Sequence, residues 1–209
     1  MSRLPGTFYA LSLRLFEMLR QREPTTDGHT LFISSARSEE GKTFTARGIA
    51  HCMADLSSDP VLLIDGNLEQ PSLHRHYGLI NGVGFSDCLA SGDAAAATLH
   101  ETTQANLKIM TVGQARKPGL LFKPQSYAAF LQHFGSRFAW ILIDGGLLGS
   151  SGCIPHQSDG VIMVVDASRT RREVIQGVMA QANVERNRYL GAVLNKRTEY
   201  IPRALYRHF

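Results

Sequence analysis

Short apolar runs and stretches of helical periodicity alternate along most of the chain. The apolar runs lie at residues 29–35, 60–66, 107–113, 139–146, 160–168 and 189–196. Apolar residues recur every three to four positions at 44–56, 126–138 and 171–185, which predicts helices there. Strands that are apolar on both sides and alternate with helices are typical of a parallel sheet covered on both faces. We therefore predict the α/β class, with a doubly wound, mostly parallel central sheet and helices on both faces.

The chain is long enough for one hydrophobic core, and we assign residues 1–209 to a single domain. Residues 6–22 are predicted to form an amphipathic helix, because charged residues such as Arg14 interrupt the apolar positions. That pattern argues against a signal peptide. The tail at 196–209 is basic and aromatic. It either docks on a partner or an anionic membrane, or covers an edge of the fold.

Charge and cysteine usage narrow the class of protein. The net charge of +4 is mild, so we expect no nucleic-acid partner. No apolar run approaches the roughly 20 residues that a membrane-spanning helix needs. The three cysteines, Cys52, Cys88 and Cys153, lie far apart and contain no C-x-x-C pair, which indicates buried thiols in a reducing compartment. We therefore expect a cytoplasmic protein.

Polar residues follow the predicted strands at the points where the strands end. The loop from position 36 follows the first apolar run, Asp65 follows the second, Asp144 the fourth and Asn195 the last. Ligands of open α/β sheets bind at the carboxyl ends of the strands. The sequence therefore predicts one site at this edge of the sheet.

The loop after the first strand ends in Gly41-Lys42-Thr43, the closing triplet of a phosphate-binding loop. Its backbone N–H groups would hold phosphate oxygens at the start of a helix. We expect the Lys42 ammonium to reach the β- and γ-phosphates and the Thr43 hydroxyl to bind magnesium. We assign the cofactor contacts of the loop to Ala36, Arg37, Ser38, Glu39, Glu40, Gly41, Lys42, Thr43 and Phe44.

Two features of the loop depart from the consensus. Ala36 stands where the consensus has glycine, which is tolerable if its backbone is not left-handed. Glu39 and Glu40 lie where a polyphosphate would bind. We expect both glutamates to contribute backbone N–H groups while their side chains point to water.

Asp65 and Asp144 each follow four apolar residues, so both carboxylates need compensation. Magnesium, bound directly or through water, is the natural partner for an acid in this position. The alternative for each residue is an acid that caps the next loop.

Four segments together resemble the bacterial tyrosine kinases, a family within the MinD- and ParA-like P-loop ATPases. They read LFISSARSEEGKTFTARGIA, VLLIDGNLEQPSLHRHYGLINGVGFSDCLAS, WILIDGG and SDGVIMVVDASRTRREVIQGVMAQANVERNRYLGAVLNK. The resemblance extends from about residue 6 to 197 and implies a P-loop NTPase fold that binds ATP or ADP with Mg²⁺.

The resemblance also implies roles for individual residues. The Walker A motif is Gly41, Lys42 and Thr43, a second acidic motif called A′ begins at Asp65, and Asp144 is the Walker B acid. The family pattern makes Lys42, Asp65 and Asp144 catalytic, and it makes Thr43, Asp65 and Asp144 the metal-binding residues. In the wider class an asparagine after the last strand contacts adenine, and Asn195 matches it by position.

A biological setting follows from the same resemblance. These kinases form the cytoplasmic part of polysaccharide co-polymerases in capsule and exopolysaccharide export. The implied partner is a membrane-embedded co-polymerase or chain-length regulator on a separate chain, which would hold the protein at the inner membrane. Weak self-association is a second expectation.

The chain departs from the family pattern in the motifs that carry catalysis. The A′ motif is acid-x-acid-x-Arg in the family, whereas here Asn67 and Glu69 replace the second acid and the arginine. The Walker B acid is followed by Thr-Pro-Pro in the family, and here by Gly145-Gly146-Leu147.

Two further departures concern assembly and the phosphorylated substrate. The ring-forming Glu-x-x-Arg-x-x-Arg helix aligns with Phe8, Leu11 and Arg14, so only its last member is kept. The tyrosine cluster of the C-terminal tail is reduced to Tyr200 and Tyr206. These losses predict an ATP-binding, kinase-like protein with weak or lost kinase activity that regulates polysaccharide assembly. The alternatives are a MinD- or ParA-like ATPase that positions a partner through nucleotide-dependent dimerisation, and a nucleotide-binding module without turnover.

Overall fold

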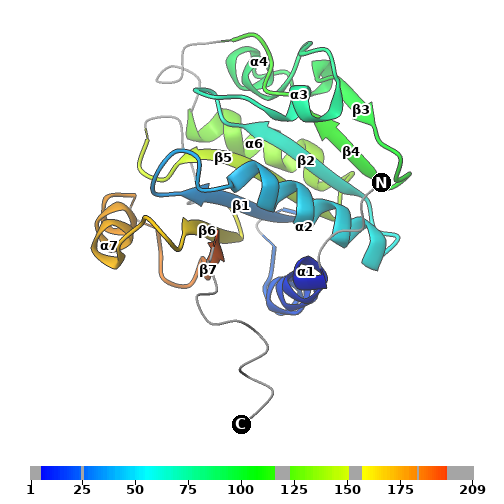
Figure 1. Ribbon diagram of the computed structural model, residues 1–209. Coiled ribbons are helices and arrows are strands. Elements are labelled where there is room, and N and C mark those ends of the chain that lie inside the picture. Colours follow the sequence, from blue (N-terminus) through cyan, green and yellow to red (C-terminus); the bar gives the residue numbers. More distant parts are fainter. Residues whose placement is uncertain (1–5, 25, 116–122, 151–156, 183, 197–209) are drawn as a thin grey trace.

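The computed structural model describes residues 6–24, 26–115, 123–150, 157–182 and 184–196, which include one seven-stranded sheet (Figure 1). The strands are β1 (His29–Ser35), β2 (Val61–Gly66), β3 (Leu99–Glu101), β4 (Leu107–Met110), β5 (Trp140–Leu147), β6 (Gly160–Asp166) and β7 (Tyr189–Asn195). Their order across the sheet is β3-β4-β2-β5-β1-β6-β7. Every neighbouring pair is parallel except β3 and β4, which are antiparallel. The predicted α/β, mostly parallel fold is confirmed.

Helices cover both faces of the sheet, as Figure 1 shows. They are α1 (Gly6–Arg20), α2 (Lys42–Leu56), α3 (Leu73–Tyr77), α4 (Phe85–Ser91), α6 (Pro124–Gly135) and α7 (Arg172–Gln181), with a short 3₁₀ turn, η1 (Ala94–Ala96). On β1, Leu31 and Ile33 pack in the core cluster that includes residues of α1 and α2. Phe32 points to the opposite face, into the cluster that includes residues of α4 and α6. Both faces of the strand are buried, which is why the sequence of β1 shows no polar alternation.

Helix α1 buries its apolar side against the rest of the fold. Leu15, Phe16 and Leu19 are buried, and the Phe16 ring meets the Trp140 ring edge-on at 4.5 Å. At the start of the helix, Phe8 fills the space above Gly48, where an added Cβ would lie only 2.6 Å from the Phe8 ring. Glycine on α2 therefore permits the close approach of α1.

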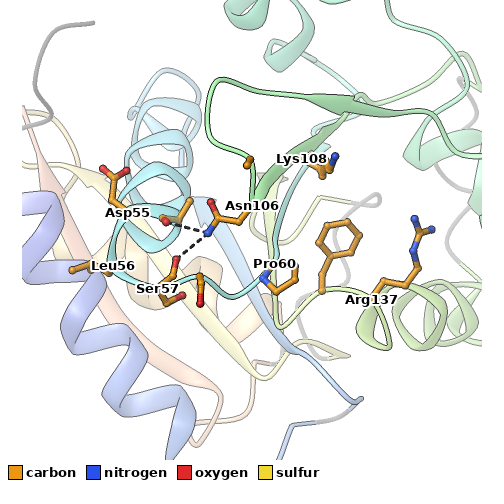
Figure 2. A pocket seen from close by; sticks show the side chains of 11 residues that line it. Asp55, Leu56, Ser57, Pro60, Asn106, Lys108 and Arg137 are labelled. Carbon is orange, nitrogen blue, oxygen red and sulfur yellow. Dashed lines mark hydrogen bonds between the residues drawn. The ribbon is translucent and has the colours of Figure 1, made fainter.

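The opposite, amino edge of the sheet carries a groove with a volume of about 940 Å³ (Figure 2). The Asn106 side-chain amide donates hydrogen bonds to the carbonyls of Ala54 and Ser57 at 3.0 and 2.9 Å. These bonds tie the end of α2 to the residue just before β4. Lys108 and Arg137 line the groove beyond Pro60. This edge lies away from the residues that the sequence singled out.

Cys52 and Cys88 are buried free thiols, as predicted. Cys153, Tyr200, Tyr206 and the rest of the tail after Lys196 lie outside the described residues. No described helix has both the length and the apolar character to span a membrane.

Candidate functional site

The predicted site residues gather at the carboxyl edge of the sheet. The loop at 36–41 joins the end of β1 to the start of α2. Asp65 on β2 and Asp144 on β5 are direct neighbours in the sheet register. At the end of β7, the Asn195 side-chain amide donates to the Glu40 carbonyl at 2.9 Å. The structure therefore brings residues from four strands to one loop.

The backbone of the loop requires glycine at position 41. Gly41 is left-handed, with φ of 97° and ψ of 26°, and it precedes the first residue of α2. A Cβ at this position would lie 2.1 Å from Nδ2 of Asn195, so both the conformation and the space favour glycine. Ala36 is not among the residues with positive φ, which explains why alanine is tolerated there, whereas Glu39 is left-handed with φ of 64°.

The Lys42 and Thr43 side chains are held by hydroxyl groups. Lys42 is buried, and its ammonium donates to Ser35 Oγ at 3.0 Å, so the side chain turns back along the loop toward β1. The Ser35 hydroxyl in turn donates to the Arg37 carbonyl at 2.6 Å. Thr43 Oγ1 forms a 3.0 Å hydrogen bond with Ser72 Oγ, just before α3. The loop thus carries an ammonium and a hydroxyl group, the side-chain groups that a phosphate site with magnesium requires.

Asp144 is fully buried, and neither of its carboxylate oxygens has a hydrogen-bond partner among the described residues. Burial, together with the Asp65 carboxylate, raises the pKa of Asp144 to about 7, while the Thr43 hydroxyl and the Lys42 ammonium act in the opposite direction. Buried acceptors without donors are costly unless a cation compensates them. Asp144 therefore fits a metal ligand.

The described residues contain no group of three or more His, Cys, Asp or Glu side chains that could hold a metal alone. Magnesium bound with a nucleotide needs fewer protein ligands, because phosphates and water complete its octahedral shell. Thr43 and Asp144, with Asp65 as a neighbour, supply a hydroxyl and carboxylates of the kind that this cation prefers. The residues present fit magnesium on these grounds.

Asp65 has a different environment although its carboxylate is equally buried. Its Oδ2 accepts from the backbone N–H groups of Ser72 and Leu73 at 2.8 and 2.9 Å, and its Oδ1 accepts from Asn67 N at 3.3 Å. Burial raises the pKa of Asp65, and these three amides oppose the rise. Its hydrogen bonds are those of an acid that caps the next loop, which leaves Oδ1, with one long hydrogen bond, as its freer oxygen.

Asn67 serves the same turn as Asp65. It is 9% exposed, and its side-chain oxygen accepts from Gln70 N at 3.1 Å. After Asp144, the Gly146 carbonyl accepts from the Ser34 hydroxyl at 2.7 Å, which ties β5 to β1 beside the loop. The Asn67 side chain thus forms a hydrogen bond within its own turn, and it places no charge near Asp65.

The prediction that the Glu40 side chain points to water is wrong. Glu40 is 2% exposed, and one carboxylate oxygen accepts from Arg37 N at 2.8 Å. The other accepts from Asp166 N at 3.0 Å and from the Thr170 hydroxyl. Converging donors make burial of the charge favourable. Nothing in the local sequence signals this, because two of the donors lie far along the chain, at the last residue of β6 and four residues after it.

The remaining loop side chains lie at the rim of the site. Arg37, Ser38 and Glu39 are exposed. Phe44 is 54% exposed and meets the Phe8 ring edge-on at 5.4 Å. The cofactor contacts assigned to these residues stay predictions.

No model of a known protein family matches the chain. Tyrosine-protein kinase CpsD of Streptococcus agalactiae is 24% identical over 176 residues, which are 82% of this chain and 75% of CpsD. The solved kinase domain of VpsO is 25% identical, with a TM-score of 0.75 over 91% of this chain and 95% of that domain. The resemblance to the bacterial tyrosine kinases is confirmed.

A more distant solved structure shares the fold. Cobyrinic acid a,c-diamide synthase of Mycobacterium smegmatis, solved with an ATP analogue and magnesium, is 19% identical with a TM-score of 0.65. The match covers 80% of this chain and 74% of the synthase. This synthase and the kinase domain of VpsO thus share the α/β fold of the chain, and the chain has a kinase-like, P-loop fold.

Proposed function

We propose that the protein binds ATP or ADP with Mg²⁺ at the 36–44 loop and acts as a kinase-like protein with weak or lost phosphoryl transfer. The observation that carries this proposal is the buried Asp144 carboxylate, which has no hydrogen-bond partner in the described part of the chain and lies beside a lysine-bearing loop. A magnesium ion that arrives with the nucleotide would compensate this buried charge.

Each residue has a distinct task in this proposal. The loop amides and the Lys42 ammonium bind phosphate oxygens, and Thr43 and Asp144 hold the magnesium ion, with Asp65 adjacent. Asn195, at the end of β7, is the residue assigned to the adenine base. When bound, ATP supplies the transferable phosphoryl group, and Mg²⁺ neutralises part of the charge on its phosphates.

Weak transfer follows from the residues around Asp65. Phosphoryl transfer depends on placing the attacking hydroxyl and on charge near the γ-phosphate. Asn67 is neutral and cannot accept a proton. Oδ2 of Asp65 already accepts hydrogen bonds from two backbone amides. The groups that bind the nucleotide are thus present, whereas the second carboxylate that would assist transfer is missing.

The proposed role is regulation of capsule or exopolysaccharide polymerisation or export. The similarity to tyrosine-protein kinases such as CpsD supports it. A membrane-embedded co-polymerase or chain-length regulator is the proposed partner, and the cytoplasm is the proposed location. The buried free thiols Cys52 and Cys88 are in keeping with a reducing compartment.

Thermal melts with and without Mg·ADP and Mg·ATP test the binding step. At a ligand concentration a hundredfold above Kd, the stabilisation is about 2.7 kcal/mol. Lys42→Ala should abolish most of the shift, whereas Lys108→Ala, a control at the other edge of the sheet, should keep it. A wild-type protein that shows no shift with either nucleotide would sink the proposal.

Transfer is tested with radiolabelled ATP on the wild type, Asp65→Ala and Asn67→Asp. We expect wild-type labelling near background and more labelling in Asn67→Asp, because the restored carboxylate can accept a proton. Robust, Asp65-dependent tyrosine labelling of the wild type would contradict weak transfer. Light scattering that shows dimers only with ATP would favour the MinD- or ParA-like alternative.

A further inference from the structure

Three side chains hold the phosphate loop from its outer side, and we call Glu40, Asn195 and Lys196 the outer clamp. Lys196 Nζ donates to the Glu39 carbonyl at 2.7 Å, and Asn195 Nδ2 donates to the Glu40 carbonyl at 2.9 Å. The Glu40 carboxylate fastens the same loop to the end of β6 through Asp166 N and the Thr170 hydroxyl. Lys196 also lies 3.4 Å from the Asp166 carboxylate.

The clamp sets the direction of the loop peptides. In a planar trans peptide, the C=O of one residue and the N–H of the next point in opposite directions. The carbonyls of Glu39 and Glu40 point outward to Lys196 and Asn195. The N–H groups of Glu40 and Gly41 therefore point away from the clamp, toward the inner side of the loop where phosphate oxygens bind.

The conformation that the clamp holds is not one the chain adopts freely. Glu39 has φ of 64°, and Lys196 itself has φ of 54°. Left-handed backbone at residues other than glycine costs free energy and persists only where the surroundings enforce it. The Lys196–Glu39 hydrogen bond joins the two residues, and the Lys196–Asp166 ion pair adds to the enforcement.

We propose that Glu40 and Lys196 are positioning residues that hold the loop amides ready for phosphate before the nucleotide arrives. The inference rests on the proposed nucleotide function and deepens it. A loop that is already ordered loses less conformational freedom on binding, so affinity is higher. Glu40 acts through the loop and not by touching the ligand, because both of its oxygens accept hydrogen bonds from the protein itself.

Only a carboxylate satisfies the three donors that face position 40. Oε2 accepts from Arg37 N, and Oε1 accepts from Asp166 N and Thr170 Oγ1. A glutamine would place an NH₂ group opposite one of these donors. That change removes a hydrogen bond and makes the NH₂ group face another donor. Glu40→Gln is therefore nearly isosteric yet breaks the clamp.

The affinity for Mg·ADP, measured by calorimetry, tests the proposal. One charge-assisted hydrogen bond corresponds to about a tenfold change in an equilibrium constant, so Glu40→Gln should raise Kd about tenfold. Lys196→Met, at a side chain that is 46% exposed and tolerant of change, should raise Kd by about three- to tenfold. Glu173→Gln removes the same charge from an exposed site on α7 and should leave Kd unchanged.

Amide hydrogen exchange of the nucleotide-free variants separates positioning from general destabilisation. Glu40→Gln and Lys196→Met should speed exchange at residues 37–42 while amides in β2 and β5 keep their protection. Wild-type affinity in both variants, or loop exchange that is unchanged in both, would overturn the clamp. Absence of ADP binding in the wild type would instead sink the nucleotide function, and the exchange data alone would then decide whether the clamp orders the loop.

Discussion

Asp65 and Asp144 lie side by side at the carboxyl edge of the sheet, and their carboxylates differ in their hydrogen bonds. Asp65 accepts three backbone N–H groups, whereas the oxygens of Asp144 have no hydrogen-bond partner among the described residues. Both pKa values are raised chiefly by burial, and only Asp65 has amides that oppose the rise. The unpartnered carboxylate is the one that a cation would stabilise most.

The raised pKa of Asp144 predicts how the nucleotide-free protein responds to pH. The folded pKa is about 7 and the unfolded value is about 3.9, so the folded state binds the proton more tightly. This contribution to stability is fully present below about pH 4 and is lost as pH rises through about 7. It amounts to at most about 4 kcal/mol.

Asp144→Asn should remove this loss, so the variant should be more stable than the wild type at pH 8 in metal-free buffer. Urea unfolding at pH 5 and pH 8 measures the difference, and Asp27→Asn is the control because Asp27 is exposed. The same pH dependence in Asp144→Asn and the wild type would contradict the assignment. The variant should also lose the stabilisation by Mg·ADP.

Local chemistry was enough to place some site residues but not others. Lys42, Thr43, Asp65 and Asp144 were predictable because the loop motif and the ends of apolar strands are features of adjacent residues. The role of Glu40 was not, because its donors at Asp166 and Thr170 come 126 and 130 residues later. The cap formed by Asp65 could be stated only as an alternative, since its donors belong to a turn without a sequence signature.

Strands that are set by their own residues were predictable, and a strand that is set by a neighbouring strand was not. Strand β1 has the predicted bounds, and β2, β5 and β7 agree within one residue at each end, because each is a dense apolar run. Strand β3 was missed, since LHE at Leu99–Glu101 is short, antiparallel and only partly buried at the sheet edge. A strand of this kind is set by its neighbour β4 and not by its own residues.

Helix α1 offers a matched pair of leucines. Leu19 is fully buried, whereas Leu13 on the same helix is 49% exposed. Leu19→Ala removes packed atoms and leaves a cavity, so it should lower the free energy of unfolding by about 2–4 kcal/mol. Leu13→Ala should change it by less than about 0.5 kcal/mol.

Chemical denaturation of both variants measures the two effects. Equal losses of stability in the two variants would show that α1 does not pack as described. A large loss confined to Leu19→Ala would establish the helix as part of the folded core.

The arrangement of the whole sheet places the loop strand centrally. Strand β1 lies between β5 and β6, so Asp144 comes from one neighbour and the Glu40 contacts at Asp166 come from the other. Strand β7 lies one step further and reaches the loop through Asn195 and Lys196. The candidate site is therefore a product of strand order and not of any single segment.

The surface of α1 predicts the state of assembly. Phe8 and Leu11 stand where the family resemblance has charged, ring-forming residues, and Phe8 is buried above Gly48. With those charges absent, we expect the ring contact to be lost and the protein to be a monomer or small oligomer. Light scattering of the purified protein, with and without Mg·ADP, measures the mass. A stable ring of octamer size would contradict the prediction.

The reach of β7 back to the loop has a consequence for synthesis on the ribosome. Lys196 and Asn195 bind carbonyls that lie 157 and 155 residues earlier in the chain. At roughly 5–20 residues per second, translation needs about 8–30 seconds to cover that distance. During this interval the nascent chain carries the phosphate-binding motif without its clamp. On the proposed function, full nucleotide affinity is therefore reached only once β7 has been made, and a chain broken off before β7 holds the motif with a lower affinity for the ligand.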